Sequence, residues 1–526
     1  RCAAQPAARR CRRRGATRRR DAARALPRPG RKKVLKLKLY NRNITGPELL
    51  NLMDEHVGTE AFEARNISMG FYSLGFKSFG ALDSRTHAAS RFRALRGDKQ
   101  FDRMCRAAKE SIERDQWTPS LLSRLVWGLT KLPRTAATEA LFAAAARAIP
   151  AIVGDARPSS VANFAWAFAT ADIEAPKVFA SLRTAVEASS SAELRLFRTR
   201  DLTITLWSFA KAGVSAPAMF DRLATEILLR DIAAFNDQSL SNTAWAFARA
   251  GHAAPALFSA IAEEMTPRIR ECASQSLVNT VWAFARMDAP APALFAAVAA
   301  DAPRYLSGGS AQSVATLAWA FATAGVHAPA FYASAEREAL KRGLGRMGDR
   351  GVANLVWAFA KADVDAPALY AAVATEFARP GRARALDMEG LSIVAWALAT
   401  ANVEAEETFD AIARELEPRV HSANPQNLSN TLWALAKSGR SGQTDADRAL
   451  FRSVAQHAVR TDLNGWNVQN VANTLWAFAK VATPPGARSY EADFFECSAR
   501  YVLNGIAESG ASGVRQFGPH SLSILA

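Results

Sequence analysis

The chain has 526 residues, of which 49% are hydrophobic, and its formal net charge is +17. This length and apolar content can support several globular domains or one long array. No segment reaches the roughly 18 to 20 uninterrupted apolar residues of a membrane span, so we expect no membrane partner. Five scattered cysteines without a CxxC pair, and seven dispersed histidines, argue against a disulfide framework or a zinc site. We therefore expect no metal and no cofactor.

The first segment, residues 1–40, is a basic tail. It holds sixteen lysines and arginines and one aspartate, a net charge of +15, which leaves only +2 for residues 41–526. The high charge of the whole chain is therefore weak support for a nucleic-acid partner. The tail has no hydrophobic signal region. Its arginine-rich, acid-poor composition is typical of an organelle transit peptide, although it lacks serine; a disordered basic arm is the alternative.

Residues 41–115 are predicted to be a degenerate helical repeat region. The string "NISMGFYSLGFKS" at 66–78 has the rhythm of the repeats that follow, with Phe71 at the position of their tryptophan.

Residues 116–516 are predicted to be tandem helical repeats, because a tryptophan motif recurs ten times at intervals of 37 to 43 residues. Only Trp117 and Trp466 fall outside this register. We number the repeats 1 to 10 by their motif tryptophans, which are Trp127, Trp166, Trp207, Trp245, Trp282, Trp319, Trp357, Trp396, Trp433 and Trp476. Residues 517–526 match the start of a further, truncated repeat.

Each repeat is predicted to contain two helices. In repeat 4, Asn236 is a suitable N-cap and Gly251 a suitable residue just beyond the helix end. Repeat 9 opens with Asn424 as cap and Pro425 in the first helical position. An Ala-Pro pair starts the second helix of six repeats, and an aromatic residue follows three positions later. The sequence thus predicts an all-α fold, an α-solenoid of about ten two-helix repeats.

A polar stripe runs along each first helix. On a helical wheel with about 100° per residue, Leu240 and Phe247 share one face of repeat 4. Near the opposite face lie, in chain order, Gln238, Asn242, Trp245 and Arg249. We call these four positions the first-helix stripe.

Two interpretations of the stripe compete. It can be a nucleic-acid surface, where tryptophan stacks on a base, amides contact base edges and the cation holds a phosphate. Alternatively, it packs one repeat on the next, and the first helix is apolar nearly all round. The tryptophan is the same in all ten copies and is followed by Ala, Gly or Ser, which favours packing, so we expect the motif Trp, Leu and Phe residues to be buried. An amide ladder bonded to loop backbone is the matching expectation for Asn163, Asn242, Asn279, Asn354, Asn430 and Asn473; Ile204 and Ile393 replace the amide elsewhere.

A cation follows the motif tryptophan by four residues in seven repeats, and threonine stands there in the other three. The helix dipole alone favours a cation in the last turn, by about 0.3–1 kcal/mol. Stacked repeats would also align these charges as a ladder suited to phosphates. The candidate nucleic-acid-binding residues are Lys131, Lys211, Arg249, Arg286, Lys361, Lys437 and Lys480.

The strings "NLSNTLWALAK" and "NVANTLWAFAK" resemble repeats of the RNA-editing substrate-binding complex 6 protein domain family. They are also similar to octotricopeptide and FAST-kinase-like leucine-rich helical arrays of organelle RNA metabolism. The resemblance covers about residues 41–526. It implies a protein of mitochondria or chloroplasts that binds single-stranded RNA and acts in RNA processing, stability, editing or rRNA maturation, with ribonucleoprotein partners. Many such proteins carry a C-terminal RAP domain.

No catalytic motif accompanies the repeats. The chain has no Walker loop, GxSxG or HExxH string, so we expect no enzyme activity, no catalytic residue and no small-molecule substrate. Glu263 and Glu264 are predicted to lie on the exposed side of a second helix. The alternatives to RNA binding are a protein-binding HEAT- or armadillo-like scaffold and an enzyme whose catalytic domain lies beyond residue 526.

Overall fold

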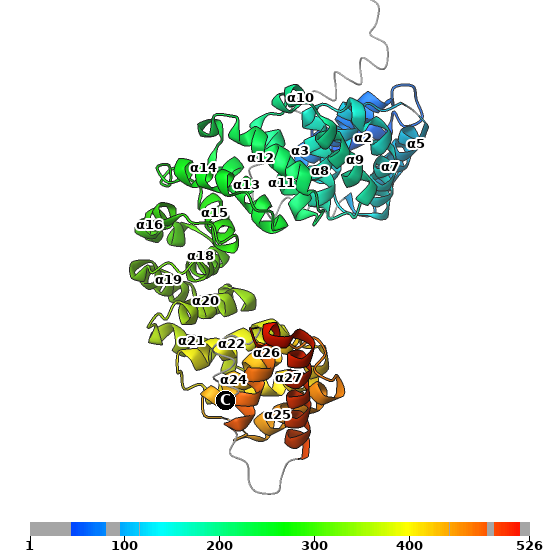
Figure 1. Cartoon of the computed structure of the whole chain (residues 1–526). Helices are drawn as coiled ribbons and strands as arrows, with labels where there is room; N and C mark the ends of the chain where they lie inside the picture. Colours follow the sequence, from blue (N-terminus) through cyan, green and yellow to red (C-terminus); the bar gives the residue numbers. More distant parts are fainter. Residues whose placement is uncertain (1–43, 80–94, 115, 441, 481–488, 516–526) are drawn as a thin grey trace, which may run out of the picture. The chain divides into compact units, whose positions relative to one another are not determined.

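The described residues of this computed structural model, 44–79, 95–114, 116–440, 442–480 and 489–515, are helical and contain no strand (Figure 1). The chain forms two compact units, residues 1–148 and 149–526, whose boundary lies inside one helix. The basic tail and the predicted truncated repeat fall outside the described residues. Within them, the predicted all-α fold of two-helix repeats is confirmed.

The first unit contains the degenerate region and repeat 1. Its helices are α2 (Gly46–Asp54), α3 (Ala64–Phe79), α5 (Lys99–Arg114), α6 (Pro119–Leu129) and the start of α7 (Ala136–Ile152). Helix α2 packs against α3 and α5, and α3 packs against α6. Two glycines meet at the α3–α6 crossing: a Cβ added to Gly128 would lie 2.4 Å from the backbone oxygen of Phe71. The two backbones can approach this closely because Gly128 has no side chain.

The predicted equivalence of Phe71 with the motif tryptophan is wrong by one residue. Phe71 is fully buried, whereas the half-buried ring of Tyr72 lies 4.8 Å from the ring of Trp127. Tyr72 therefore takes the tryptophan position in the degenerate repeat.

Helix α7 ends repeat 1. Together with the following turn it forms the stretch Ala136–Asp155, which has the length and apolar composition of a membrane span. It is the single such stretch in the described part of the chain. Leu141, Phe142, Ala145 and Ile149 are buried in the protein, as the inner face of a second helix should be.

The second unit contains repeats 2 to 10. The first helices are α8 (Pro158–Ala171), α11 (Thr199–Lys211), α13 (Asp237–Ala250), α15 (Ser274–Arg286), α18 (Ala311–Thr323), α20 (Asp349–Lys361), α22 (Met388–Thr400), α24 (Pro425–Lys437) and α26 (Val468–Ala479). The second helices are α9 (Pro176–Ala188), α12 (Pro217–Leu228), α14 (Pro255–Met265), α16 (Pro292–Ala300), α19 (Pro329–Arg342), α21 (Pro367–Ala378), α23 (Glu406–Leu416), α25 (Asp445–Arg460) and α27 (Ser489–Arg515). Short helical connectors join several repeats: η1 (Val153–Asp155), α10 (Ser191–Arg195), η2 (Ile232–Ala234), α17 (Ala302–Gly308), η3 (Leu344–Arg346), η4 (Ala383–Ala385) and η5 (Glu417–Ser422).

Local chemistry sets the helix starts as predicted. The backbone N–H groups of Ser239 and Asn427 donate to the side chains of the N-caps Asn236 and Asn424, each over 2.8 Å. Proline occupies the first turn of six second helices, where its missing N–H costs nothing.

The first helices end in the same way from repeat 2 to repeat 9. The sixth residue after the tryptophan adopts a positive φ. The backbone N–H of the residue after it donates to the carbonyl five residues earlier, at the helix end, which would otherwise have no hydrogen-bond partner. In repeat 4 these are Gly251, at φ 66°, and the 3.0 Å bond from His252 to Phe247. Gly, Asp or Asn occupies the position, because these residues tolerate this conformation best.

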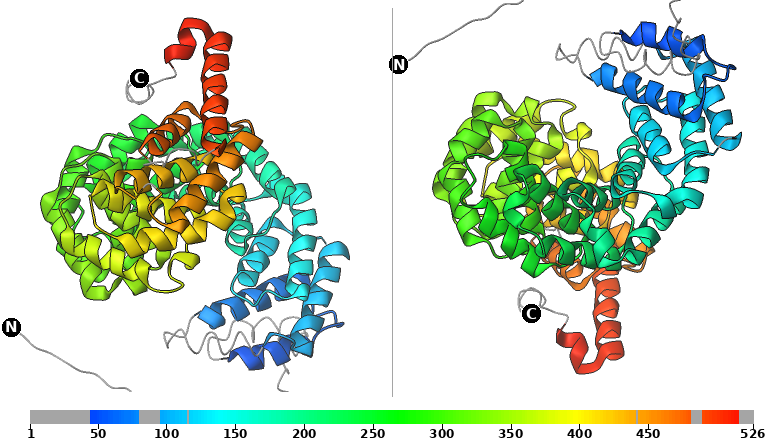
Figure 2. Two further views of the ribbon diagram at one scale, coloured as in Figure 1. Left: turned by 90° about the horizontal axis from the view of Figure 1, so that it is seen from below. Right: turned by 90° about the horizontal axis from the view of Figure 1, so that it is seen from above.

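Neighbouring repeats interlock through their first helices, each of which packs against the next along the second unit (Figures 1 and 2). The small residue after each motif tryptophan is buried in every repeat, as Ala283 and Ala358 illustrate. Aromatic residues of each second helix pack edge-on against the first helix of the following repeat. The ring centroids of Phe220 and Phe247 are 5.0 Å apart, and those of Phe258 and Phe284 are 4.9 Å apart.

A second recurring arginine, which the sequence analysis missed, lies at or just after the end of a second helix and bonds the connector that precedes its own repeat. Arg342 donates to the carbonyls of Gly309 (2.8 Å), Leu306 (2.5 Å) and Ser307 (3.0 Å), and pairs with Glu338 at 2.6 Å. Comparable bonds are made by Arg230, Arg268, Arg304 and Arg419.

Glu264 belongs to this set, which corrects one expectation. It pairs with Arg268 at 3.1 Å and only 22% of its side chain is exposed, whereas Glu263 is exposed as predicted. The recurring pair of a glutamate with an arginine four residues later was the signal that could have revealed these contacts.

Replacing Arg342 with methionine should destabilise the protein by about 3 kcal/mol, because it removes charge-assisted hydrogen bonds and leaves Glu338 poorly paired. Arg337→Met on the same helix is the control, since Arg337 is exposed and bonds only Ser334. We expect its effect to stay within about 0.5 kcal/mol. Urea denaturation measures both variants, and equal midpoints would show that the connector bonds contribute nothing.

Candidate nucleic-acid interface

The first-helix stripe is only partly covered by neighbouring repeats. In repeat 4, Gln238 and Arg249 are exposed and Asn242 and Trp245 are half-buried, while Leu240 lies in the core with 1% exposure. All ten motif tryptophans are half-buried. The expectation of buried Leu and Phe is confirmed, but the assignment of the tryptophans to the core is wrong.

The reason is geometric. The first helix contacts its second helix and two neighbouring first helices, which leaves one strip of its surface uncovered. The tryptophans lie along the border of that strip. By contrast, the two tryptophans outside the register, Trp117 and Trp466, are 6% and 5% exposed.

The expected amide ladder is also wrong. Asn279 accepts a hydrogen bond from Gln275 of its own helix over 2.9 Å. None of the six stripe asparagines bonds loop backbone within the described residues, and all six are half-buried. These amides therefore remain accessible to a ligand.

The tryptophan rings of consecutive repeats contact one another. Ring centroids are 6.1 Å apart for Trp207 and Trp245 and 6.4 Å apart for Trp245 and Trp282, with interplanar angles of 33° and 31°. Similar contacts join the rings of repeats 6 and 7 (6.4 Å) and of repeats 9 and 10 (6.1 Å). From repeat 3 to repeat 10, no indole N–H is buried or hydrogen-bonded in the described structure.

The predicted cations flank these rings. The ammonium or guanidinium group lies over the ring of its own repeat's tryptophan at 5.3 to 5.8 Å from the centroid, within the range of cation–π attraction. This contact is made by Lys131, Lys211, Arg286, Lys437 and Lys480.

Six of the seven cations are exposed: Lys211, Arg249, Arg286, Lys361, Lys437 and Lys480. Lys131, in the first unit, is half-buried, and burial lowers the pKa of its ammonium group. Arg286 also donates from Nε to the carbonyl of Ala248 at the end of the preceding first helix, over 3.1 Å. The helix-end interpretation thus accounts for part of the role of Arg286. The other charges of the second unit remain available at the surface.

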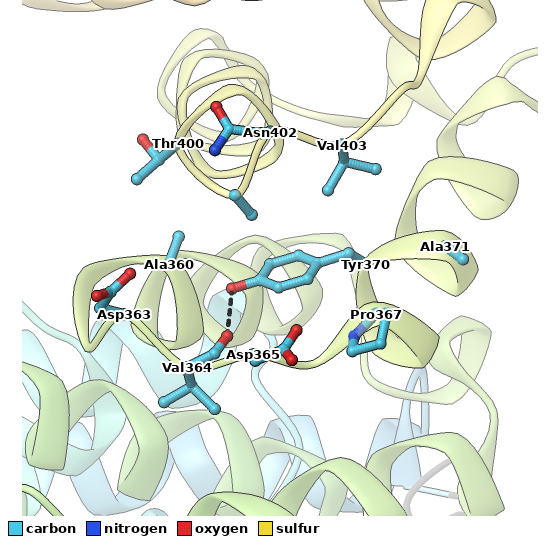
Figure 3. A pocket seen from close by; sticks show the side chains of 11 residues that line it. Ala360, Asp363, Val364, Asp365, Pro367, Tyr370, Ala371, Thr400, Asn402 and Val403 are labelled. Atoms are coloured by element: carbon cyan, nitrogen blue, oxygen red, sulfur yellow. Dashed lines mark hydrogen bonds between the residues drawn. The ribbon is translucent and has the colours of Figure 1, made fainter.

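A pocket of about 560 Å³ lies where repeats 7 and 8 turn from first to second helix (Figure 3). Asp363 and Asp365 line it from one repeat, and Thr400 and Asn402 from the next. Tyr370 donates to the carbonyl of Val364 over 3.2 Å. Burial, with added repulsion from the two aspartates, raises the pKa of its phenol far above the usual value. This turn is therefore acidic, unlike the stripe beside it.

The stripe therefore offers cations in seven of ten repeats, aromatic faces, partly exposed amides and, from repeat 3 to repeat 10 of the described structure, indole N–H groups without a partner. Such a surface can bind a polyanion whose flat bases stack on rings. Among the described residues, no cluster of three or more His, Cys, Asp or Glu could hold a metal ion.

Comparison with known proteins adds little. No family model and no curated protein matches the chain. One similar solved structure is described as "Structure of APUM23-deletion-of-insert-region-GGAAUUGACGG", at 11% identity over 92% of this chain and 98% of that one, with a TM-score of 0.23. A TM-score this low does not indicate a shared fold. The fold is established by the helices and contacts described above.

Proposed function

We propose that this chain is a single-stranded RNA-binding helical-repeat protein that acts in organellar RNA processing, stability, editing or rRNA maturation. One observation carries the proposal: a partly exposed tryptophan with a cation over its ring recurs on the same face of the first helices of repeats 1, 3, 5, 9 and 10. Stacking on aromatic rings combined with phosphate neutralisation is the usual means of binding single strands. The resemblance of the repeat strings supports the organellar role, and the composition of the tail supports organelle targeting.

We also propose that the chain acts by binding rather than by catalysis. The alternative function, a protein-binding scaffold, would use the same accessible surface. The near-neutral charge of residues 41–526 is the feature that favours it. The two functions differ in their dependence on salt, because only a polyanion releases a condensed layer of counterions.

The test is RNA binding by residues 41–526, which lack the basic tail, measured by fluorescence anisotropy across a salt series. We expect the triple variant Lys211→Gln, Arg249→Gln, Arg286→Gln to bind more weakly. Its logarithmic salt slope should be lower by about two units, at about 0.7 per lost phosphate contact. Circular dichroism must show that the triple variant remains folded.

The matched control removes three charges from second helices, by Lys177→Gln, Arg337→Gln and Lys341→Gln, at exposed positions outside the stripe. We expect this variant to bind almost as well as the unchanged protein. Absence of salt-dependent binding by the unchanged protein, or equal losses in both triple variants, would refute the proposal and favour the scaffold.

A further inference from the structure

The stripe is not uniform along the array: consecutive repeats that all carry the cation, and whose tryptophan rings contact one another, fall in two groups. Repeats 3, 4 and 5 all carry the cation, and their rings form one continuous series of contacts. We call this group the upstream segment. Repeats 9 and 10 also carry the cation, and their rings contact each other. We call this pair the downstream segment.

Repeats 6 to 8, the middle repeats, carry one cation at this position, Lys361, and one contact between motif rings, that of Trp319 with Trp357. Threonine replaces the cation at Thr323 and Thr400. Among the described residues, the ring of Trp396 contacts neither neighbouring motif ring, and the motif rings of repeats 5 and 6 do not contact each other. The row of aromatic faces is therefore interrupted on both sides of repeats 6 and 7.

The stripe of repeat 8 carries an acidic residue and no cation. Glu389 and Ile393 replace the amides of the stripe in repeat 8. Arg350, on the stripe of repeat 7, is held by Glu389 at 2.8 Å and by Asp387 at 3.5 Å, so its charge is largely neutralised.

Lys361 is the one cation of the middle repeats at the fourth position after the tryptophan, and acidic groups follow it closely. Asp363 and Asp365 line the adjacent pocket (Figure 3). The next turn exposes three more carboxylates, those of Glu404, Glu406 and Glu407. The corresponding turns of repeats 3 and 4, "AGVSAP" and "AGHAAP", contain no acidic residue. Exposed charges closer than about 8 Å are only partly screened at physiological salt, so a phosphate near these carboxylates would be bound less favourably.

We propose that single-stranded nucleic acid contacts the second unit at two separate places, the upstream and downstream segments, and bypasses the middle repeats. The inference rests on the proposed function and adds to it the form of the ligand: two short contacted stretches joined by an uncontacted one. Binding one stretch raises the effective concentration of the other, so the joined ligand binds more tightly than either half.

The test uses the full chain and three labelled probes. The first is an unbroken oligouridylate, and the second is a single oligouridylate segment of about eight nucleotides. The third joins two such segments through uncharged hexaethylene-glycol spacers of increasing length. We expect the best spaced probe to bind within about threefold of the unbroken one, and at least about tenfold more tightly than the single segment.

Three variants then assign the two contacts. The upstream variant is Lys211→Gln with Arg249→Gln, the downstream variant is Lys437→Gln with Lys480→Gln, and the control is Lys177→Gln with Lys341→Gln, at exposed positions outside the stripe. In either segment variant the spaced probe should bind no better than a single segment, whereas the control should leave the advantage intact. The basic tail is present throughout, so it cannot produce a difference that depends on the segment removed.

Two results would overturn the inference alone. The first is a spaced probe that binds no better than a single segment in the unchanged protein, which would mean a continuous contact. The second is a loss in the control variant, Lys177→Gln with Lys341→Gln, equal to that in the segment variants. Absence of salt-dependent binding by the tail-less protein, by contrast, would refute the proposed function and this inference together.

Discussion

Replacing Trp245 and Trp282 together with leucine is expected to weaken RNA binding about a hundredfold or more while leaving the protein folded. Each base stacked on an aromatic side chain contributes about 1–3 kcal/mol, and leucine has no aromatic face. Both tryptophans are half-buried at the border of the stripe, and leucine still covers the adjoining apolar surface. Stability should therefore fall much less than it does for a core substitution.

Trp466→Leu is the matched control, because Trp466 is 5% exposed and lies outside the repeat register. We expect it to lower stability by about 2 kcal/mol through the cavity it leaves, with little change in RNA affinity. Anisotropy titrations give the affinities, and urea denaturation gives the stabilities. A double variant that binds RNA normally but unfolds easily would show that the motif tryptophans are a packing ridge.

The second large effect is expected from Gly128→Ala, which should destabilise the first unit by about 3 kcal/mol or more. The new Cβ would lie 2.4 Å from the oxygen and 2.6 Å from the carbon of the Phe71 carbonyl group, and 2.8 Å from the nitrogen of Tyr72. All three are backbone atoms of α3, so no side chain can rotate away. Relief requires the helices to move apart, which loses the packing between them.

Gly308→Ala provides the control, because a Cβ added there has no heavy atom within 4 Å. Alanine is also a better helix former than glycine, so this variant should be neutral or slightly stabilised. Thermal and urea denaturation, followed by circular dichroism, compare the two variants. Equal stability would mean that α3 and α6 adjust freely, and that the glycine at their crossing is not required.

Much of the fold is determined by the sequence itself. Features such as Asn236, Gly251 and the prolines that open the second helices act on neighbouring backbone, so their effect can be derived from spacing alone. The tryptophan period likewise predicts the two-helix repeat. The burial of Leu240 and Phe247 follows from the helical period, since both lie on one face of the helix.

The placement of the stripe was decided only by the tertiary structure. The sequence correctly places Asn242, Trp245 and Arg249 on one side of a helix, but the choice between a packed and an open side depends on where neighbouring helices lie. The connector bonds of Arg342 were missed for the same reason, because their partners are about 33 to 36 residues away. A local pattern describes one helix. The uncovered strip, and with it the candidate binding surface, is what remains of a first helix after its second helix and two neighbouring first helices have packed against it.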